Sequence, residues 1–242
     1  MVAAVDEAVV SAKGARRWQQ GHPWIYRSDV ERRPGVAAGV VRVRDGRGKG
    51  IGQALWSPHS EISLRLLDPD PSARIDGAWF TTTVAHAASR RAPLCARGNA
   101  YRLIHGEGDG LPSFICDVYD RWLVVQLMSA GLEACREHIV AALCEVMRPA
   151  GILARNDVAL RKKEGLSLES QLLHGTVPGS IAVEEDGIRY EASPWEGQKT
   201  GAYLDQRENR ALVGSIARGR GLDCFSYHGS FALHMARRCD HV

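Results

Sequence analysis

Short runs of alternating apolar and polar residues fill the first seventy positions, with glycine and proline between them. Residues 39–46 alternate and end in Asp-Gly, a strong hairpin signal, and residues 49–56 supply the returning strand. Residues 61–67 alternate again, and prolines at positions 69 and 71 end the run because proline cannot continue a helix or a ladder. The pattern predicts a small β-barrel or sandwich.

The apolar spacing becomes helical between residues 75 and 92, which predicts one amphipathic connector helix. Further along, strand-like runs occupy residues 101–104, 114–119, 122–127 and 152–155, and helical spacing occupies residues 133–147. This order predicts a compact α+β unit over residues 100–160.

The last sixty residues combine a hairpin, a polar loop and a strand-to-helix turn. Residues 181–191 alternate around Asp186-Gly187, which predicts a hairpin, and the polar loop 197–201 follows. Residues 222–231 predict a buried strand, a tight turn at Gly229 and the start of a helix. A nucleotide-type cofactor site begins in this way in a doubly wound sheet. An ordinary strand-to-helix turn is the alternative, because the three-glycine dinucleotide spacing is absent.

Charge is unevenly distributed along the 242 residues. Residues 1–49 contain ten Lys and Arg against five Asp and Glu, whereas residues 50–242 contain 21 against 23. A basic N-terminal part favours an anionic partner, of which nucleic acid is the usual one, and a solvated basic face is the alternative.

The cysteines and the N-terminal sequence bear on the compartment. The six cysteines are Cys95, Cys116, Cys135, Cys144, Cys224 and Cys239. They have no CxxC spacing and most have apolar neighbours, which predicts reduced core thiols. The first thirty residues show no signal-peptide pattern, and no run approaches eighteen apolar residues. We therefore expect a cytoplasmic protein, and we expect no metal because the nine histidines lack zinc-site spacing.

Five motifs carry a resemblance to a known family. They are residues 21–30 (Gly-His-Pro-Trp-Ile-Tyr-Arg-Ser-Asp-Val), 106–112 (Gly-Glu-Gly-Asp-Gly-Leu-Pro), 161–166 (Arg-Lys-Lys-Glu-Gly-Leu), 197–207 (with Gly-Gln-Lys-Thr-Gly and Leu-Asp-Gln-Arg) and 223–229 (Asp-Cys-Phe-Ser-Tyr-His-Gly). In this order they make the sequence similar, from Arg17 to the end, to the class I S-adenosylmethionine-dependent large-subunit (23S) ribosomal RNA cytosine-C5 methyltransferases that carry an N-terminal PUA domain.

The resemblance implies an α+β multidomain protein with S-adenosyl-L-methionine as cofactor and ribosomal RNA as partner. It implies a PUA β-barrel at residues 1–72, a central α+β domain at residues 73–180, and a hairpin and the start of a Rossmann-like α/β methyltransferase domain at residues 181–242. Such a domain needs several strand–helix units of roughly 30 residues, and one strand and one helix are present. We therefore expect a truncated chain that is inactive alone, with its catalytic residues beyond Val242.

The resemblance places the loop after residue 197 over the cofactor. Lys199 and Arg207 would hold the methionine carboxylate, and Asp223 would take the amino group. The expected cofactor-binding residues are Gln198, Lys199, Thr200, Gly201, Tyr203, Asp205, Arg207, Asp223, Phe225, Ser226, Tyr227 and Gly229. In the structural alternative, Asp205 and Arg207 cap and charge the helix that follows.

The basic N-terminal barrel is the part expected to recruit RNA. Its expected phosphate contacts are Arg16, Arg17, Arg32, Arg33, Arg42, Arg44, Arg47 and Lys49. Phosphate contacts position a protein on RNA without reading the base sequence. Trp24 and Tyr26 either stack on a base or pack the barrel, and the second interpretation is favoured.

Several other polar groups have two interpretations. The loop 106–110 suits a ligand or an ordinary exposed turn, and the turn is favoured. Arg155, Asp157, Arg161 and Glu164 form either an RNA-guiding patch or ion pairs that hold the central domain to its neighbour.

Two alternatives concern the function itself. Cysteine is the nucleophile that C5 methylation needs, but Cys224 and Cys239 lie where core residues are expected. A non-catalytic RNA-binding protein with a relic cofactor site is the second hypothesis for the whole chain. The target base and a homodimeric state are left open.

Overall fold

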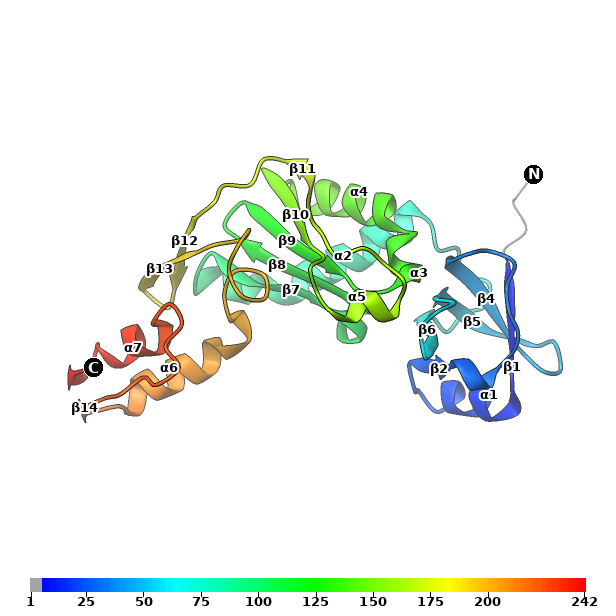
Figure 1. Cartoon of the computed structure of the whole chain (residues 1–242), viewed down its shortest axis with the longest axis horizontal. Helices are drawn as coiled ribbons and strands as arrows, with labels where there is room; N and C mark the ends of the chain where they lie inside the picture. Colours follow the sequence, from blue (N-terminus) through cyan, green and yellow to red (C-terminus); the bar gives the residue numbers. More distant parts are fainter. Residues whose placement is uncertain (1–5) are drawn as a thin grey trace.

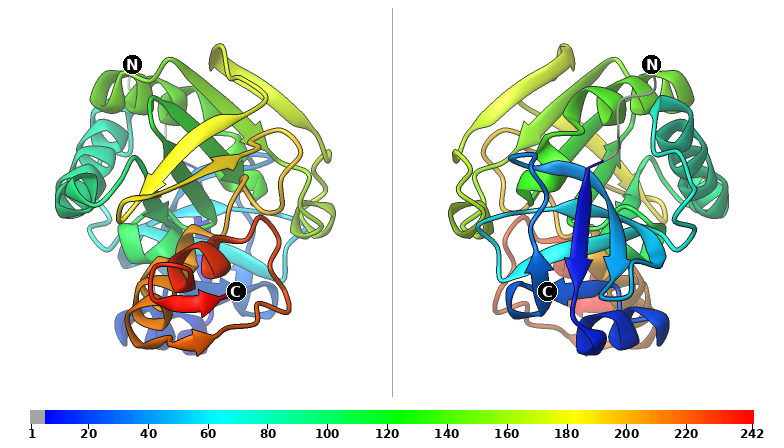
Figure 2. Two further views of the ribbon diagram at one scale, coloured as in Figure 1. Left: turned by 90° about the vertical axis from the view of Figure 1, so that its left-hand side faces the viewer. Right: turned by 90° about the vertical axis from the view of Figure 1, so that its right-hand side faces the viewer.

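The structure is a computed structural model that describes residues 6–242. The molecule is elongated, with an N-terminal β-sheet at one end, a second sheet in the middle and a small C-terminal unit at the other end (Figure 1). Seen along the long axis, the three parts lie one behind another (Figure 2).

The N-terminal part is a six-stranded sheet with strand order β2-β6-β5-β4-β1-β3. Its elements are β1 (Glu7–Val10), α1 (Ala12–Gln19), β2 (Trp24–Tyr26), the 3-10 turn η1 (Arg27–Asp29), β3 (Val30–Arg32), β4 (Gly39–Asp45), β5 (Gly50–Trp56) and β6 (Ile62–Asp68). The predicted hairpin is present as β4 and β5, which pair antiparallel, whereas β1 runs parallel to β4. Ile25, Val41 and Trp56 belong to the core of this barrel-like sheet.

The central part is a five-stranded sheet with strand order β11-β10-β9-β8-β7. Its elements are α2 (Gly77–Arg91), η2 (Ala92–Ala96), β7 (Ala100–His105), η3 (Gly106–Asp109), β8 (Phe114–Tyr119), β9 (Trp122–Leu127), α3 (Ala130–Glu133), α4 (Arg136–Met147), β10 (Gly151–Arg155), α5 (Leu160–Lys163) and β11 (Ser170–Gly175). Phe80 of α2 and Ile139 of α4 share one core cluster with the sheet. The predicted connector helix is present, and so are the predicted strands at 101–104, 114–119, 122–127 and 152–155, with the predicted helix 133–147 divided into α3 and α4.

The C-terminal part begins with the predicted hairpin. Its elements are β12 (Ile181–Glu185), β13 (Ile188–Ala192), η4 (Leu204–Gln206), α6 (Arg207–Ile216), β14 (Gly219–Arg220), α7 (Ser230–Met235) and β15 (Cys239–His241). Strands β14 and β15 pair in parallel and are connected through α7, which is the arrangement of a first strand–helix–strand unit of a parallel sheet.

The prediction of a buried strand at residues 222–227 is wrong. Strand β14 ends at Arg220, and the side chains of Leu222 and Phe225 are 82% and 98% exposed. An apolar run forms a buried strand only when neighbouring strands pair with it and other elements cover its faces. Here β15 is the one partner of β14 among residues 6–242, and the run continues as an exposed loop before α7.

The cysteines are unpaired, but they are not all core residues. Cys116 and Cys135 are buried, whereas Cys95 and Cys224 are exposed, because the first follows the end of α2 and the second lies on the exposed loop. Burial raises the pKa of the Cys135 thiol to about 11. Among residues 6–242, no helix is long and apolar enough to cross a membrane.

Candidate functional site

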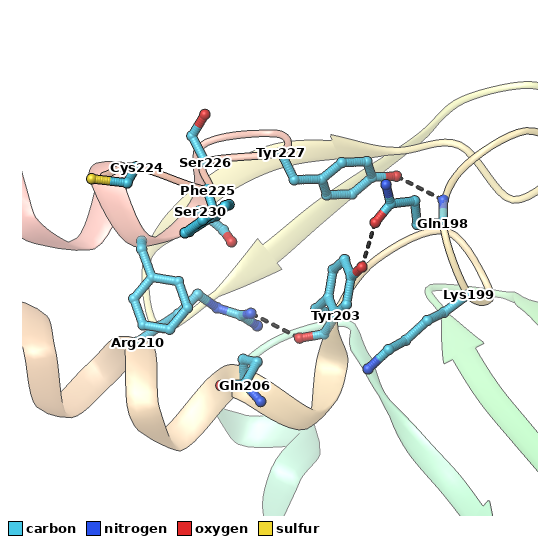
Figure 3. A pocket seen from close by; sticks show the side chains of 11 residues that line it. Gln198, Lys199, Tyr203, Gln206, Arg210, Cys224, Phe225, Ser226, Tyr227 and Ser230 are labelled. Atoms are coloured by element: carbon cyan, nitrogen blue, oxygen red, sulfur yellow. Dashed lines mark hydrogen bonds between the residues drawn. The ribbon is translucent and has the colours of Figure 1, made fainter. Parts of the chain in front are cut away.

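A cavity of about 740 Å³ lies between the loop that precedes η4, the helix α6 and the loop that precedes α7 (Figure 3). Its lining residues are Gln198, Lys199, Tyr203, Gln206, Arg210, Cys224, Phe225, Ser226, Tyr227, Ser230 and Phe231. Four aromatic rings therefore face one space together with amide, hydroxyl and cationic groups. Volumes of about 300–1,000 Å³ with apolar walls and a few polar groups are typical of small-molecule sites.

The loop 197–201 is held against the central sheet by buried hydrogen bonds. The Thr200 hydroxyl donates to Asp117 Oδ2 (2.6 Å), and Tyr119 Oη accepts from the Ala202 amide (3.0 Å). The guanidinium of Arg155 donates to the carbonyl oxygen of Gly197 (3.0 Å). These contacts fix one wall of the cavity on a rigid sheet, which preorganises it for a ligand.

Glycine is required at position 197. A Cβ atom at Gly197 would lie 2.5 Å from the carbonyl oxygen of Ser193, so any side chain would collide with the backbone. The tight loop therefore depends on this residue.

Two tyrosines link the loop to the segment before α7. Tyr227 Oη accepts from the Gln198 amide (3.0 Å), and the Tyr203 hydroxyl donates to Gln198 Oε1 (Figure 3). The two rings stand edge to face, 5.6 Å apart between centroids. Their pairing is a favourable aromatic geometry, and it closes the loop side of the cavity.

Lys199 gives the cavity a cation that already has an anionic partner. Its Nζ lies 4.3 Å from the centroid of the Tyr203 ring and 2.9 Å from both carboxylate oxygens of Asp205. Burial raises the pKa of Asp205, but the hydrogen bonds from Lys199 outweigh it, and the pKa lies below its ordinary value. Both groups are half-exposed, so a ligand carboxylate can compete for the ammonium.

Arg210 enters the cavity from α6 and is anchored behind it by a buried carboxylate. Arg210 Nη2 and Nε donate to the two carboxylate oxygens of Glu185, at 2.6 and 2.7 Å. Arg210 Nη1 donates to the carbonyl oxygen of Tyr203. Arg207 and His234 also contact Glu185, at 3.7 and 3.3 Å. Burial raises the pKa of Glu185, but the contact with Arg210 lowers it by more. The pKa therefore lies below its ordinary value, and the carboxylate stays ionised.

His228 stacks behind the cavity rather than lining it. Its ring lies 4.8 Å from that of Tyr190 at an interplanar angle of 20°, and 4.6 Å from that of Tyr227. Neither ring nitrogen has a hydrogen-bond partner among the described residues. Burial and the nearby Arg210 lower the pKa of His228, which keeps the ring neutral.

The structure brings together part of the residue set that the sequence indicates for the cofactor. Six of these side chains line the cavity, namely Gln198, Lys199, Tyr203, Phe225, Ser226 and Tyr227. Asp205 lies just outside and binds Lys199. Gly201 is part of the fixed loop, and Gly229, with φ +76°, ends the turn before α7.

Three predicted side chains point elsewhere. Thr200 is buried against Asp117, and Arg207 is buried between Glu185 and the Ala100 carbonyl oxygen, so Arg207 neither lines the cavity nor caps α6. Asp223 accepts from the Ala232 amide (3.1 Å) and so stabilises the first turn of α7.

Sequence reasoning missed five lining residues, which are Gln206, Arg210, Cys224, Ser230 and Phe231. Gln206 and Arg210 are four residues apart at the start of α6 and therefore lie on one helix face. That spacing was a usable signal. Cys224 was expected in a core strand and instead lies on the exposed loop.

The basic residues of the N-terminal sheet fall into two groups. Arg32, Arg42 and Arg44 surround the carboxylate of Glu7, at 4.0, 3.7 and 2.8 Å. Arg17 contacts Asp29 and covers the ring of Tyr26.

The other four basic side chains are more available. They are Arg16, Arg33, Arg47 and Lys49, which are exposed and have no ion pair within residues 6–242. The free positive charge of this end therefore lies on these four side chains more than on the three around Glu7.

Two of the polar groups with open interpretations make contacts between the N-terminal and central parts. Glu107 of the loop 106–110 accepts from Trp24 Nε1 (2.7 Å), so the loop connects the two sheets. Arg65 and Glu164 form an ion pair of 2.8 Å between the N-terminal and central parts, with both side chains buried. Glu107 and Glu164 thus join the two parts, whereas Arg155 pairs with Asp157 and Arg161 with Glu133 inside the central part.

The fold of the chain resembles that of known proteins. Residues 9–69 match the family model of the PUA-like domain, which defines the N-terminal sheet as a domain of this class. The computed structure resembles two solved structures at 22% identity: a SAM-dependent methyltransferase from Streptococcus mutans (TM-score 0.76, 95% of this chain and 60% of that chain) and a methyltransferase, SMU.776, complexed with SAH (TM-score 0.79, 95% and 59%). The expected multidomain fold is confirmed.

Similarity in sequence points to a particular group of proteins. The chain is 40% identical over 218 residues to the ribosomal RNA large subunit methyltransferase I of Pseudoalteromonas atlantica, covering 88% of this chain and 55% of the relative. It is 39% identical over 232 residues to that of Yersinia pseudotuberculosis, covering 93% and 59%. The resemblance read from the five motifs is confirmed, and the chain spans just over half the length of these relatives.

Proposed function

We propose that the chain is the RNA-binding and cofactor-binding part of an S-adenosylmethionine-dependent methyltransferase that forms 5-methylcytosine in large-subunit ribosomal RNA, in the cytoplasm. The observation that carries the proposal is the aromatic cavity built on the fixed loop 197–201, in a chain 40% identical to proteins named ribosomal RNA large subunit methyltransferase I.

The residues of the cavity fit S-adenosylmethionine. Phe225, Phe231 and the Tyr203–Tyr227 pair offer aromatic surface for an adenine ring. Lys199, half-exposed beside Asp205, offers an ammonium for the methionine carboxylate. The bound cofactor supplies the methyl group, and the protein residues hold and orient it.

Some residues act in this proposal through the backbone. Gly201 and Gly229 shape the two loops that face the cavity, and Thr200 and Asp223 hold those loops in place. We propose that the remaining members of the expected set, Asp205 and Arg207, tune and support Lys199 and Arg210 without touching the cofactor.

RNA is proposed to bind the basic side chains of the PUA-like domain. Arg16, Arg33, Arg47 and Lys49 are exposed and can contact phosphates directly, whereas Arg32, Arg42 and Arg44 share Glu7 and contribute through the field of the whole cluster. Arg17 supports Tyr26.

Cofactor binding is tested by titration with S-adenosylhomocysteine in a calorimeter. Replacing Phe225 by Ala should weaken binding by about fivefold or more, because an aromatic contact of about 1 kcal/mol is lost. Phe225 is 98% exposed, so the change leaves the fold intact. Leu222→Ala is the matched control, since Leu222 is exposed on the same loop but does not line the cavity. Equal affinity of the two variants would contradict the placement of the cofactor.

The reaction is tested with labelled S-adenosylmethionine and ribosomal RNA, using the longer protein if the chain is part of one. Label at C5 of cytosine supports the proposal, and label at another base or position refutes the cytosine-C5 assignment. RNA binding without any affinity for S-adenosylhomocysteine would favour the non-catalytic RNA-binding protein instead. Sedimentation equilibrium of the chain tests whether it forms a homodimer.

A further inference from the structure

A second cavity, of about 700 Å³, lies between the PUA-like domain and the central domain, far along the molecule from the cofactor cavity. We call it the interdomain cavity. Its lining residues are Trp24, Arg27, His59, Ser60, Glu61, Ile62, Arg65, Glu107, Ser113, Met128, Leu160, Lys163 and Glu164. They come from β2, η1 and the 59–65 segment on one side. On the other side they come from η3, from the loops before β8 and after β9, and from α5 and the residue that follows it. In Figure 1, α5 lies on the side of the central sheet nearer to β6.

Contacts on both sides fix the shape of the interdomain cavity. Trp24 Nε1 donates to Glu107 across the two domains (2.7 Å), which holds the indole ring in one orientation. Deeper in the cavity, the Arg65–Glu164 pair joins the domains, and Glu164 also accepts from the Ala130 amide. The space is therefore a formed site with a fixed aromatic wall.

The charges of the cavity largely neutralise one another. Arg65 is paired with Glu164, and Arg27 with Glu61 (2.9 Å). Lys163, an exposed residue of α5, is the cationic lining residue without an ion pair among residues 6–242. Glu107 is the lining carboxylate without an ion pair among residues 6–242, so its charge and that of Lys163 balance. Such a lining suits a nucleotide whose base enters beside Glu107 and whose phosphate stays outside at Lys163.

The lining has the chemistry with which proteins take up unpaired RNA bases. Single-stranded RNA is recognised by splaying bases out and stacking them on aromatic side chains, with hydrogen bonds to their edges. Trp24 supplies the ring, and Met128 and Leu160 supply apolar surface. Glu107 keeps a second carboxylate oxygen that can accept from an exocyclic amino group of a base.

We propose that the interdomain cavity receives an unpaired base of the bound RNA, which lies against Trp24 while its phosphate contacts Lys163. The proposal rests on the RNA-binding function proposed above and adds a site for single-stranded RNA, separate from the basic side chains around Glu7. The proposal explains the hydrogen bond from Trp24 to Glu107, because a tryptophan that only packed the barrel would need no such bond to the central domain.

The first test fills the cavity. Leu160 is 45% exposed and lines the cavity, whereas Leu168 is 38% exposed and does not. Leu160→Trp should weaken binding of an unstructured oligoribonucleotide of about 12 nucleotides by about tenfold, since stacking of a base contributes strongly to such binding. Leu168→Trp should leave it within about twofold. A duplex of about 16 base pairs should bind both variants alike, because its bases cannot enter.

The second test removes the cation. Lys163→Ala should weaken binding of the same oligoribonucleotide by about threefold and lower its salt dependence, whereas Lys162→Ala, an exposed neighbour that does not line the cavity, should change it less. Equal effects of Lys162→Ala and Lys163→Ala, or of Leu160→Trp and Leu168→Trp, would overturn the proposal. So would a loss of duplex binding as large as the loss of single-strand binding.

A third measurement needs no variant. An oligoribonucleotide with 4-thiouridine at each position in turn should cross-link to the peptide that contains Trp24. Cross-links confined to peptides with Arg16, Arg33 or Arg47 would support RNA binding but refute the interdomain site. If the unaltered chain binds neither RNA, the proposed RNA-binding function fails, and the interdomain site fails with it.

Discussion

Replacing Glu185 by Gln should destabilise the C-terminal unit strongly. The Glu185 side chain is fully buried and accepts two hydrogen bonds from Arg210, with Arg207 and His234 also in contact. The substitution keeps the shape but removes the charge, so two buried guanidinium groups lose their counter-ion. Breaking a buried pair by removing one partner costs about 3–5 kcal/mol, and the retained amide oxygen places the expected loss at about 3 kcal/mol.

The neighbouring Glu184 provides a matched control. Its carboxylate lies 3.3 Å from Arg189 with both side chains largely exposed, 50% and 85%. A surface pair of this kind contributes little, so Glu184→Gln should change stability by less than about 0.5 kcal/mol. The two substitutions are chemically identical and adjacent on β12, and the two sites differ in burial and in the number of charged partners.

Hydrogen exchange is the suitable assay, because a chain of several parts need not unfold in one step. Glu185→Gln should accelerate exchange in β12, α6 and α7 by about two orders of magnitude, the factor that corresponds to about 3 kcal/mol. Exchange in β4 and β5 of the PUA-like domain should not change. Equal exchange rates in Glu184→Gln and Glu185→Gln would refute the assignment of Glu185 as the anchor of this unit.

Two further predictions concern the junction of the domains and the effect of pH. In a double-mutant cycle, Arg65→Met and Glu164→Leu should each destabilise the chain by about 3 kcal/mol in denaturant unfolding. The double variant should lose clearly less than the sum of the two, because both charges are then removed. Additive losses would contradict a coupled pair. Burial lowers the pKa of His228 and His234 below 6.5, so their neutral forms stabilise the fold above pH 6.5 and this stability is lost as the pH falls below it. His228→Phe should make thermal stability between pH 7.5 and pH 5.5 less dependent on pH, whereas replacing the exposed His86 by Phe should not.

Local signals in the sequence predicted both hairpins and the helices α2 and α4, but they missed α1 and α5. Asp45-Gly46 and Asp186-Gly187 lie at the turns of their hairpins because turn chemistry acts over a few residues. The buried strand at 222–227 failed because burial depends on partners from elsewhere in the fold. Leu222 and Phe225 have strand-like character, but the one neighbour of β14 within residues 6–242 is β15.

The candidate cavity was half predictable for the same reason. Gln198, Tyr203 and Tyr227 could be assigned from motifs that recur in a family, although nothing in the sequence shows that Tyr227 bonds the Gln198 amide across 29 positions. Arg207 and Arg210 illustrate the limit. Both are arginines near the start of one helix, and their positions relative to Glu185 of a preceding strand decide which one reaches the cavity.

The central domain sets the distance between the two proposed binding sites. At one end, Arg65–Glu164 and Trp24–Glu107 join it to the PUA-like domain around the interdomain cavity. At the other end, Asp117 of β8 accepts from Arg102 (2.9 Å) and from Thr200 (2.6 Å), so the loop of the cofactor cavity is fixed to the same sheet.

Both junctions therefore combine apolar contact with hydrogen bonds to charged groups, which are short and directional. In the proposed function, a spacer fixed in this way at both ends would hold an RNA segment in the interdomain cavity at a constant distance from the cofactor. The proposed methylation of one selected nucleotide would need such a constant distance, since contacts to phosphates alone fix no position along the RNA sequence.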